Sequence, residues 1–369
     1  MFRRYVVAPL VLAVFALGVV STGGAVVASA PGPQPQLITG VPGTSLLYVV
    51  ATSGGTCAVG PCLRLERTTL SLSHVTTVHL PPLRKASGNL LGDLSQLTFA
   101  NATDGYAALN GSRSLLWYVT TNGAESWRRI AVAPGQSIVE LEATGGALYA
   151  VVAHCVKRFA CSNYRIARSP LAANRWTYSA LPAALSQGGF ALAAYGANVW
   201  VNLSGARGPQ LFISHNAGRT FIERKPAQLV SVSACDLTPE SPTVLWAECP
   251  TGMLVSFFYS NDGGSSWRSI SRFAFAGTGG GAFAPVSSSL AYLDFGPFTS
   301  RHPDLYLING ARGTMTPAGN LVCSSAWGLV FANASRGVAL CAQNTTSTTT
   351  MSLRRTTDGG RSWTTVRLT

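Results

Sequence analysis

Short runs of apolar, β-branched and aromatic residues, each bounded by turn residues, recur along the whole chain after residue 30. Four such runs lie close together at 138–144, 147–154, 164–169 and 176–181. No segment after the N-terminus keeps a helical period, and 38 Gly with 20 Pro suit many tight turns. The pattern therefore predicts an all-β protein built from short antiparallel strands.

An eight-residue pattern returns at one phase of these runs, clearest at 120–127, 214–221, 260–267 and 356–363. Each copy has a hydroxyl residue, Asp or Asn two positions later, small residues and an eighth aromatic residue. The Asp or Asn side chain can accept hydrogen bonds from nearby backbone N–H groups, and glycine supplies positive φ, so each copy predicts a tight turn. Its defining residues are Thr120, Asn122, Trp127, Ser214, Asn216, Phe221, Ser260, Asp262, Gly264, Trp267, Thr356, Asp358, Gly360 and Trp363.

This pattern resembles the Asp-box, S-x-D-x-G-x-T-W, of sialidase-like β-propellers. In that family the box is a turn between two strands of a blade and takes no part in catalysis, so the resemblance implies a structural role for these residues. The copy at 356–363 is also similar to the T-x-D-G-G-x-T-W boxes of the photosystem II assembly factor family. Those proteins are seven-bladed propellers that work without catalysis.

The spacing of the boxes predicts the number of blades. Degenerate copies at 169–176 and 307–314 lie in the two long gaps between the clear copies. Near residue 68, before the first clear copy, the flanking residues of a box are kept although the box itself is not. The seven starts then lie 45 to 52 residues apart, which is typical of four-stranded propeller blades. A second repeated segment supports this number of blades, because residues 99–105 and 331–337 are similar in sequence and lie at the same position within their repeat units. We therefore predict a seven-bladed propeller over 36–369, with boxes between third and fourth strands and blades at about 36–82, 94–134, 137–182, 188–226, 229–272, 280–317 and 320–369.

The N-terminus resembles a secretion signal over residues 1–30, with Arg3 and Arg4 before an apolar run and Ala28-Ser29-Ala30 at its end. Residues 31–35 form a short Pro-rich linker. Export is expected, to the exterior or the cell envelope. Removal of the segment and its retention as a membrane anchor both stay open, because Pro31 follows the cleavage motif directly.

Eight cysteines in an exported chain indicate disulfides. The repeat map predicts four local pairs, which are Cys57–Cys62, Cys155–Cys161, Cys235–Cys249 and Cys323–Cys341. We expect no metal and no cofactor, because the chain has no C-x-x-C motif and its five His are scattered.

The formal net charge of +13 permits an anionic partner, such as an acidic glycan or an envelope polymer. The arginines are spread singly and form no basic run, so we expect no binding to nucleic acid. A generally basic, solvated surface is the simpler interpretation of the charge. We expect a monomer that contacts a membrane only if the N-terminal segment is retained.

Catalytic candidates are few. Tyr164-Arg165-Ile166-Ala167 resembles the F/Y-R-I-P motif of sialidases, in which the arginine holds the substrate carboxylate, but the proline is missing and the motif comes too late in the chain. Glu140 and Glu142 alternate along the predicted inner strand of the third blade, about 7 Å apart, a separation compatible with a two-carboxylate glycosidase. Both carboxylates nevertheless lie on one strand, where they cannot easily flank a bond.

The sequence thus predicts a secreted, disulfide-bonded propeller that acts as a non-catalytic binding or scaffold module for an extracellular glycan, envelope polymer or protein. The alternative is a sialidase-like glycoside hydrolase that uses Glu140, Glu142 or Arg165.

Overall fold

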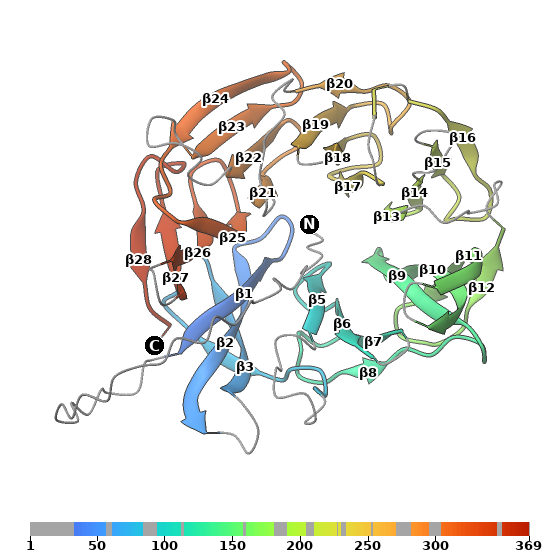
Figure 1. The fold of residues 1–369 in the computed structure, drawn as a ribbon, viewed down its shortest axis with the longest axis horizontal. Coiled ribbons are helices and arrows are strands. Elements are labelled where there is room, and N and C mark those ends of the chain that lie inside the picture. Colours follow the sequence, from blue (N-terminus) through green and yellow to red (C-terminus); the bar gives the residue numbers. More distant parts are fainter. Residues whose placement is uncertain are drawn as a thin grey trace, which may run out of the picture.

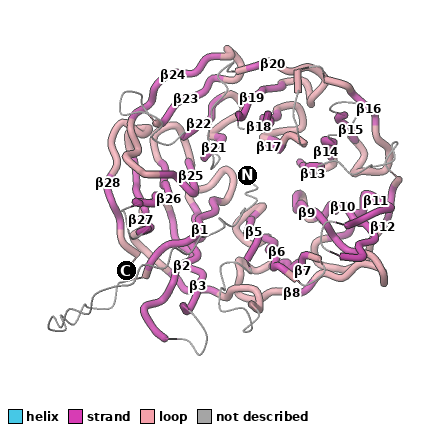
Figure 2. Tube along the Cα trace, viewed as in Figure 1, coloured by secondary structure: helices cyan, strands magenta, loops and turns pink. Residues whose placement is uncertain are grey.

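A computed structural model describes residues 33–56, 61–83, 94–111, 114–157, 160–180, 190–203, 210–226, 228–229, 234–251, 254–270, 282–294, 304–344 and 349–368. In these ranges the chain forms seven four-stranded antiparallel sheets arranged as blades around a ring (Figure 1). The predicted all-β, seven-bladed propeller is confirmed. The described elements are all strands (Figure 2), and none of the described residues belongs to a helix able to span a membrane. The predicted signal segment lies outside the described residues.

The strands of the first four blades have the following bounds. Blade 1 comprises β1 (Gln34–Gly40), β2 (Leu46–Thr56), β3 (Pro61–Thr69) and β4 (Thr76–Val78). Blade 2 comprises β5 (Leu94–Phe99), β6 (Gly105–Asn110), β7 (Leu115–Thr120) and β8 (Arg128–Arg129). Blade 3 comprises β9 (Ser137–Thr144), β10 (Ala147–Lys157), β11 (Ala160–Pro170) and β12 (Thr177–Ser179). Blade 4 comprises β13 (Phe190–Tyr195), β14 (Asn198–Leu203), β15 (Gln210–Ser214) and β16 (Ile222–Arg224).

The remaining three blades follow the same plan. Blade 5 comprises β17 (Asp236–Pro239), β18 (Leu245–Thr251), β19 (Leu254–Ser260) and β20 (Arg268–Ser269). Blade 6 comprises β21 (Ala282–Pro285), β22 (Leu290–Asp294), β23 (Leu305–Asn309) and β24 (Thr314–Gly319). Blade 7 comprises β25 (Ser325–Phe331), β26 (Gly337–Asn344), β27 (Thr349–Thr356) and β28 (Thr364–Val366).

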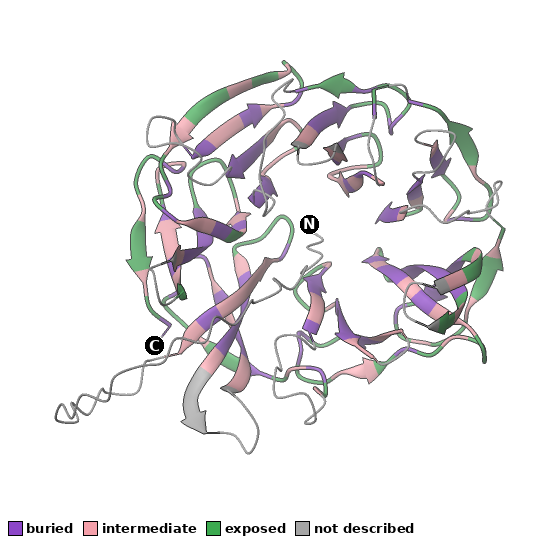
Figure 3. Ribbon diagram, viewed as in Figure 1, coloured by how far each residue is buried: buried purple, intermediate pink, exposed green. Residues whose placement is uncertain are grey.

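The first strand of each blade lies nearest the centre of the ring and the fourth lies at its periphery, where much of the strand surface is exposed (Figures 1 and 3). Antiparallel order places the turns between strands 1 and 2 and between strands 3 and 4 on one rim, which we call the box rim. The opposite rim, the loop rim, holds the starts of strands 1 and 3 and the ends of strands 2 and 4. β1 begins at Gln34, inside the segment that the sequence suggests as a linker.

The apolar core is divided into one cluster between each pair of neighbouring blades. This division arises because the two faces of a blade point toward its neighbours, so alternate residues of every strand pack against different blades. β10 shows this alternation: its cluster with blade 2 contains Leu148, Ala150 and Val152, and its cluster with blade 4 contains Ala147, Tyr149 and Val151.

Each blade is also linked to the next by a side-chain hydrogen bond near the box rim. The donor lies at the start of the second strand or on its cross-strand partner in the third, as in the pairs Tyr48–Arg67 and Trp246–Tyr259. The links are Tyr48 Oη to Ala102 O (3.3 Å), Tyr106 Oη to Glu142 Oε2 (2.9 Å), Tyr149 Oη to Gly196 O (2.9 Å), Trp200 Nε1 to Gly263 O (2.8 Å), Tyr259 Oη to Ser288 O (2.9 Å), Tyr292 Oη to Ala334 O (2.8 Å) and Arg355 Nη1 to Ser71 O (2.8 Å). Every interface, including the one between blades 7 and 1, has such a link.

The repeated segments 99–105 and 331–337 form two equivalent sockets for these links. The ring of Tyr292 stacks on Phe331 at a centroid distance of 3.9 Å, while its hydroxyl donates to the carbonyl of Ala334. Tyr48 and Phe99 stack in the same way at 3.6 Å. A Cβ atom on Gly337 would come within 2.7 Å of the Phe331 ring, so the glycine is required by close packing.

The ring closes without any shared strand, because β1–β4 and β25–β28 each form a complete sheet of consecutive strands. Among the described residues, side-chain contacts hold this seam. Leu47, Val49, Val338 and Leu340 are among the residues that form its buried apolar cluster. Gly328 lies so close to Ile38 that an added Cβ would approach its Cγ1 to 2.5 Å, which shows how tightly β25 and β1 pack.

We predict that Tyr292→Phe lowers the free energy of unfolding by about 1 kcal/mol, because the Ala334 carbonyl loses its donor while the stacked ring stays. The matched control is Tyr195→Phe, since Tyr195, the last residue of β13, is 41% exposed. Denaturant unfolding of both variants measures the difference. Equal midpoints for the two variants would show that the link contributes nothing.

Candidate functional site

The four clear boxes are turns with one hydrogen-bond pattern. The first residue, such as Thr356, is buried, and its hydroxyl donates to Asp358 Oδ1 at 2.8 Å and accepts from Gly360 N at 2.9 Å. Asp358 Oδ1 also accepts from Ser362 N at 3.0 Å. Two successive residues have positive φ, 76° at Gly359 and 86° at Gly360, which explains the glycines. These side chains are occupied within their own turns.

The same bonds occur in the other three boxes. Thr120 with Asn122, Ser214 with Asn216, and Ser260 with Asp262 each repeat the hydroxyl–Asx contact, at 2.9, 3.0 and 2.8 Å. Gly264 has a φ of 89°, and Trp267 Nε1 and Trp363 Nε1 each donate at 3.0 Å to a carbonyl of their own box. Trp127 instead donates to His79 O, and Phe221 packs against the core between blades 3 and 4.

Asp and Asn make different use of this geometry. In the Asp boxes the carboxylate accepts a hydrogen bond from a second hydroxyl group, that of the seventh residue of the box, and Ser362 Oγ lies 2.6 Å from Asp358 Oδ2. The bonds from Ser362 and Thr356 lower the pKa of the Asp358 carboxyl to about 2. In the Asn boxes the amide donates instead, from Asn122 Nδ2 to Ser126 Oγ at 3.0 Å. Either residue type therefore satisfies the turn.

The three catalytic candidates occupy different settings. Glu140 is buried in β9, and Glu142 on the same strand accepts the hydroxyl hydrogen bond of Tyr106 from blade 2. Arg165 is exposed on β11 and pairs with Val152 of β10. Because β10 lies between β9 and β11, the backbone of Arg165 lies about 10 Å from the backbone of the strand that carries the two glutamates. Arg165 and the two glutamates therefore do not lie on neighbouring strands of the blade.

Three disulfides lie on the loop rim and join Cys155 to Cys161, Cys235 to Cys249 and Cys323 to Cys341. They are the local pairs that the repeat map predicts. Cys62 is also disulfide-bonded, whereas Cys57 falls outside the described residues. The ranges that the structure describes contain no group of three His, Cys, Asp or Glu side chains suited to a metal ion.

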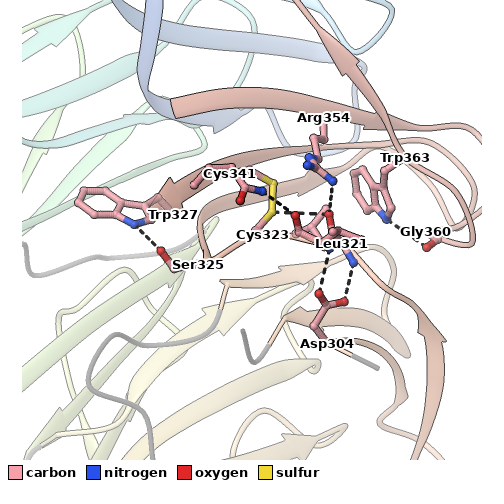
Figure 4. The surroundings of a disulfide bond; sticks show 11 residues. Asp304, Leu321, Cys323, Ser325, Trp327, Cys341, Arg354, Gly360 and Trp363 are labelled. Atoms are coloured by element: carbon pink, nitrogen blue, oxygen red, sulfur yellow. Dashed lines mark hydrogen bonds between the residues drawn. A yellow bond between two sulfur atoms is a disulfide. The ribbon is translucent and has the colours of Figure 1, made fainter. Parts of the chain in front are cut away.

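Two apolar side chains, Trp327 and Val322, are exposed near the Cys323–Cys341 disulfide, whose surroundings Figure 4 shows. Trp327 is 47% exposed, although it belongs to the inner strand β25. It is the extra residue of a β-bulge, because Ala326 pairs with Cys341 and Gly328 with Leu340. Its indole Nε1 donates to Ser325 Oγ at 2.9 Å.

The second exposed group is Val322, which is 64% exposed and has a φ of 55°. This left-handed conformation is unfavourable for a β-branched residue, so its surroundings must hold it. Asp304 Oδ2 accepts from Val322 N at 3.0 Å, and Gln343 Nε2 donates to Val322 O at 2.7 Å. The disulfide begins at the next residue, Cys323. Val322 and Trp327 are thus both held rigidly on the loop rim.

Sequence reasoning missed both residues and the aromatic links between blades. The bulge at Trp327 leaves no trace in the hydrophobic pattern, whereas the inter-blade donors do leave a signal. Tyr48, Tyr149 and Tyr292 all lie in the third position of their second strands.

The chain matches no family model and no curated protein. Solved structures do match. The β-propeller domain of the Trilobed protease from Pyrococcus furiosus, which has an open velcro topology, aligns with a TM-score of 0.59 at 11% identity, over 93% of this chain and 97% of that domain. An acylaminoacyl peptidase from Pyrococcus horikoshii gives 0.54 at 9% identity, over 92% of this chain and 52% of that one. YCF48 bound to a D1 peptide gives 0.49 at 10% identity, over 74% and 81%. At these identities, the first two of these matches show a common fold alone.

We predict that the box carboxylate makes the fold acid-sensitive in a defined window. The pKa of Asp358 is lowered in the folded state to about 2 from 3.8, so its ionised form stabilises the fold above about pH 4. That contribution is lost as the pH falls toward 2. Asp358→Asn keeps the turn at neutral pH, as Asn122 does in its box, and loses less stability between pH 4 and 2 than the wild type.

Denaturant midpoints across this range, with Ser362→Ala as a second variant, provide the measurement. Ser362→Ala removes a donor to the carboxylate, so an NMR titration should show a higher Asp358 pKa in that variant. An unchanged pKa would contradict the assigned cause.

Proposed function

We propose that this chain is an exported binding module without catalytic activity, and that it holds a polypeptide partner at the corner formed by Val322 and Trp327 on the loop rim. The observation that carries this proposal is the rigid presentation of two exposed apolar side chains beside a disulfide. Exposed Trp is uncommon on a folded domain, and Trp is enriched among the residues that dominate binding energy in protein interfaces.

Pre-organisation supports the same role. The bulge fixes the direction of the Trp327 side chain, and hydrogen bonds on both sides of Val322 fix its backbone. Because the site is already ordered, binding a partner costs little conformational entropy of this protein, which favours affinity. The isopropyl group of Val322 and the indole of Trp327 offer two separate apolar contacts on one rim, which suits a polypeptide partner.

Export is the second part of the proposal. Three disulfides are compatible with an oxidising compartment, and the sequence of residues 1–30 resembles a secretion signal. The disulfide Cys323–Cys341 would keep the corner intact where no chaperone or reductant is present.

Site-specific photo-cross-linking tests the proposal. A benzophenone amino acid at position 327 is expected to capture a discrete polypeptide in the native envelope, whereas the same group at Tyr178, which is 37% exposed on β12, is not. With the captured partner purified, Val322→Asp should weaken binding by roughly tenfold or more. The matched control is Ile222→Asp, because Ile222 is 49% exposed on β16 and should be silent. Equal capture at 327 and 178, or equal loss in both Asp variants, would refute the site.

The hydrolase alternative has its own measurement. A panel of chromogenic glycosides should release no sugar with the purified protein. Release that Glu142→Gln abolishes would overturn the non-catalytic assignment, because Glu142 would then act on substrate in addition to accepting the Tyr106 hydrogen bond.

A further inference from the structure

An arc of single exposed arginines follows the box rim from blade 3 to blade 7. Each arginine lies in the turn between the third and fourth strands or begins the fourth strand. The members are Arg175, Arg219, Arg268, Arg312 and Arg361, one from each blade. We call this set the arginine arc.

The backbone of the arc is fixed while its charges face solvent. Arg175 N donates to Ser169 Oγ at 3.0 Å, and Arg312 N donates to Asn309 Oδ1 at 2.9 Å. Among the residues described, the guanidinium groups of Arg175, Arg219, Arg312 and Arg361 have no hydrogen bond or salt bridge. Arg268 donates to Ala311 O, which orients it along the boundary between blades 5 and 6.

The acidic groups near the arc are already engaged. Asp262 and Asp358 accept hydrogen bonds inside their boxes, and Glu223 lies 3.6 Å from the amine of Lys225. In blade 2 the box carries Glu125, whose carboxylate lies 3.5 Å from Arg67 of blade 1. The arginine arc therefore ends before blade 2, where the acidic Glu125 of the box is paired with Arg67.

A small pocket interrupts the arc at its middle. Its volume is about 210 Å³, and it is lined by Tyr259, Asn261, Ser266, Trp267, Arg268 and Ala311. This volume is below the usual range for drug-sized ligand sites, so the pocket suits one small polar group. Arg268 contributes the only formal charge among the lining residues.

We propose that the arginine arc and the pocket at Arg268 bind a linear anionic polymer of the cell envelope, carrying carboxylate or phosphodiester groups. One unit of the polymer occupies the pocket, where Arg268 meets its charge and Asn261 and Ser266 meet its hydroxyl groups. Neighbouring units meet Arg219 and Arg312 on the adjacent blades. This surface lies on the rim opposite Trp327, so it is independent of the proposed polypeptide site.

The lining favours such a polymer over nucleic acid. Single-stranded nucleic acid is held by stacking its bases on exposed aromatic rings. The pocket's aromatic residues, Tyr259 and Trp267, are each only 6% exposed and offer no open face. The accessible groups are an amide, a hydroxyl and a guanidinium, which match hydroxylated, charged units.

Binding to three defined polymers tests the proposal. Polygalacturonate supplies carboxylates, polyglycerol phosphate supplies phosphodiesters and dextran is neutral. At low salt, we expect the full chain to bind one or both polyanions and not dextran. In Arg268→Gln/Arg312→Gln the affinity should fall roughly tenfold or more, and the slope of log K against log salt should fall by about two, one for each lost contact.

The control is Arg224→Gln/Arg367→Gln, which removes two exposed arginines that lie at the end of β16 and beyond the end of β28, away from the box turns. It should change affinity by less than about threefold, because only long-range attraction is reduced. Equal losses in both double variants would show non-specific attraction to a basic surface and overturn the site. Tighter binding of an oligonucleotide of equal charge would overturn the ligand class. Trp327→Ala should bind the polyanion as the wild type does, which separates this test from that of the polypeptide site.

Discussion

The structure depends on one constraint, which is that every blade forms its strand ladders within its own four strands. In the described residues no ladder joins neighbouring blades, so side-chain contacts hold most of the ring together, with a single backbone bond from His79 N to Ala124 O (3.0 Å) added between blades 1 and 2. An apolar cluster fills each interface, and one directional hydrogen bond from Tyr, Trp or Arg sets how the next blade docks. One box takes part in these links directly, because Trp200 Nε1 donates to Gly263 O in the box turn of blade 5.

The repeats made the fold predictable. The spacing of the boxes gave seven blades, and local pairing within a blade gave three of the observed disulfides. The echo between 99–105 and 331–337 also has a physical cause, since both segments receive a stacked tyrosine from the preceding blade. Trp327 could not be predicted in this way. Its exposure depends on a β-bulge, and the almost continuous apolar run 326–331 hides the change of phase that the bulge makes.

The two rims differ in chemistry, and this difference shapes the functional proposals. On the loop rim, a disulfide fixes apolar side chains that suit a polypeptide. On the box rim, turns fix the backbone and leave single arginines toward solvent. A module with both surfaces would attach to an anionic envelope polymer through one rim and leave the other free for a partner. Glu142 illustrates the opposite case, in which a residue that suggested chemistry contributes to the contact between blades.

The central claim is that side-chain contacts close the ring at the seam between blades 7 and 1, where the described residues contain neither a shared strand nor a connecting loop. Thiol labelling of a buried cysteine in the native protein tests it directly. Val338→Cys places the thiol in the seam cluster, and Val199→Cys places it in the cluster between blades 3 and 4; both valines are 0% exposed. Labelling at position 338 should be roughly ten times faster or more, because the seam opens first. Equal or slower labelling at position 338 would contradict the account.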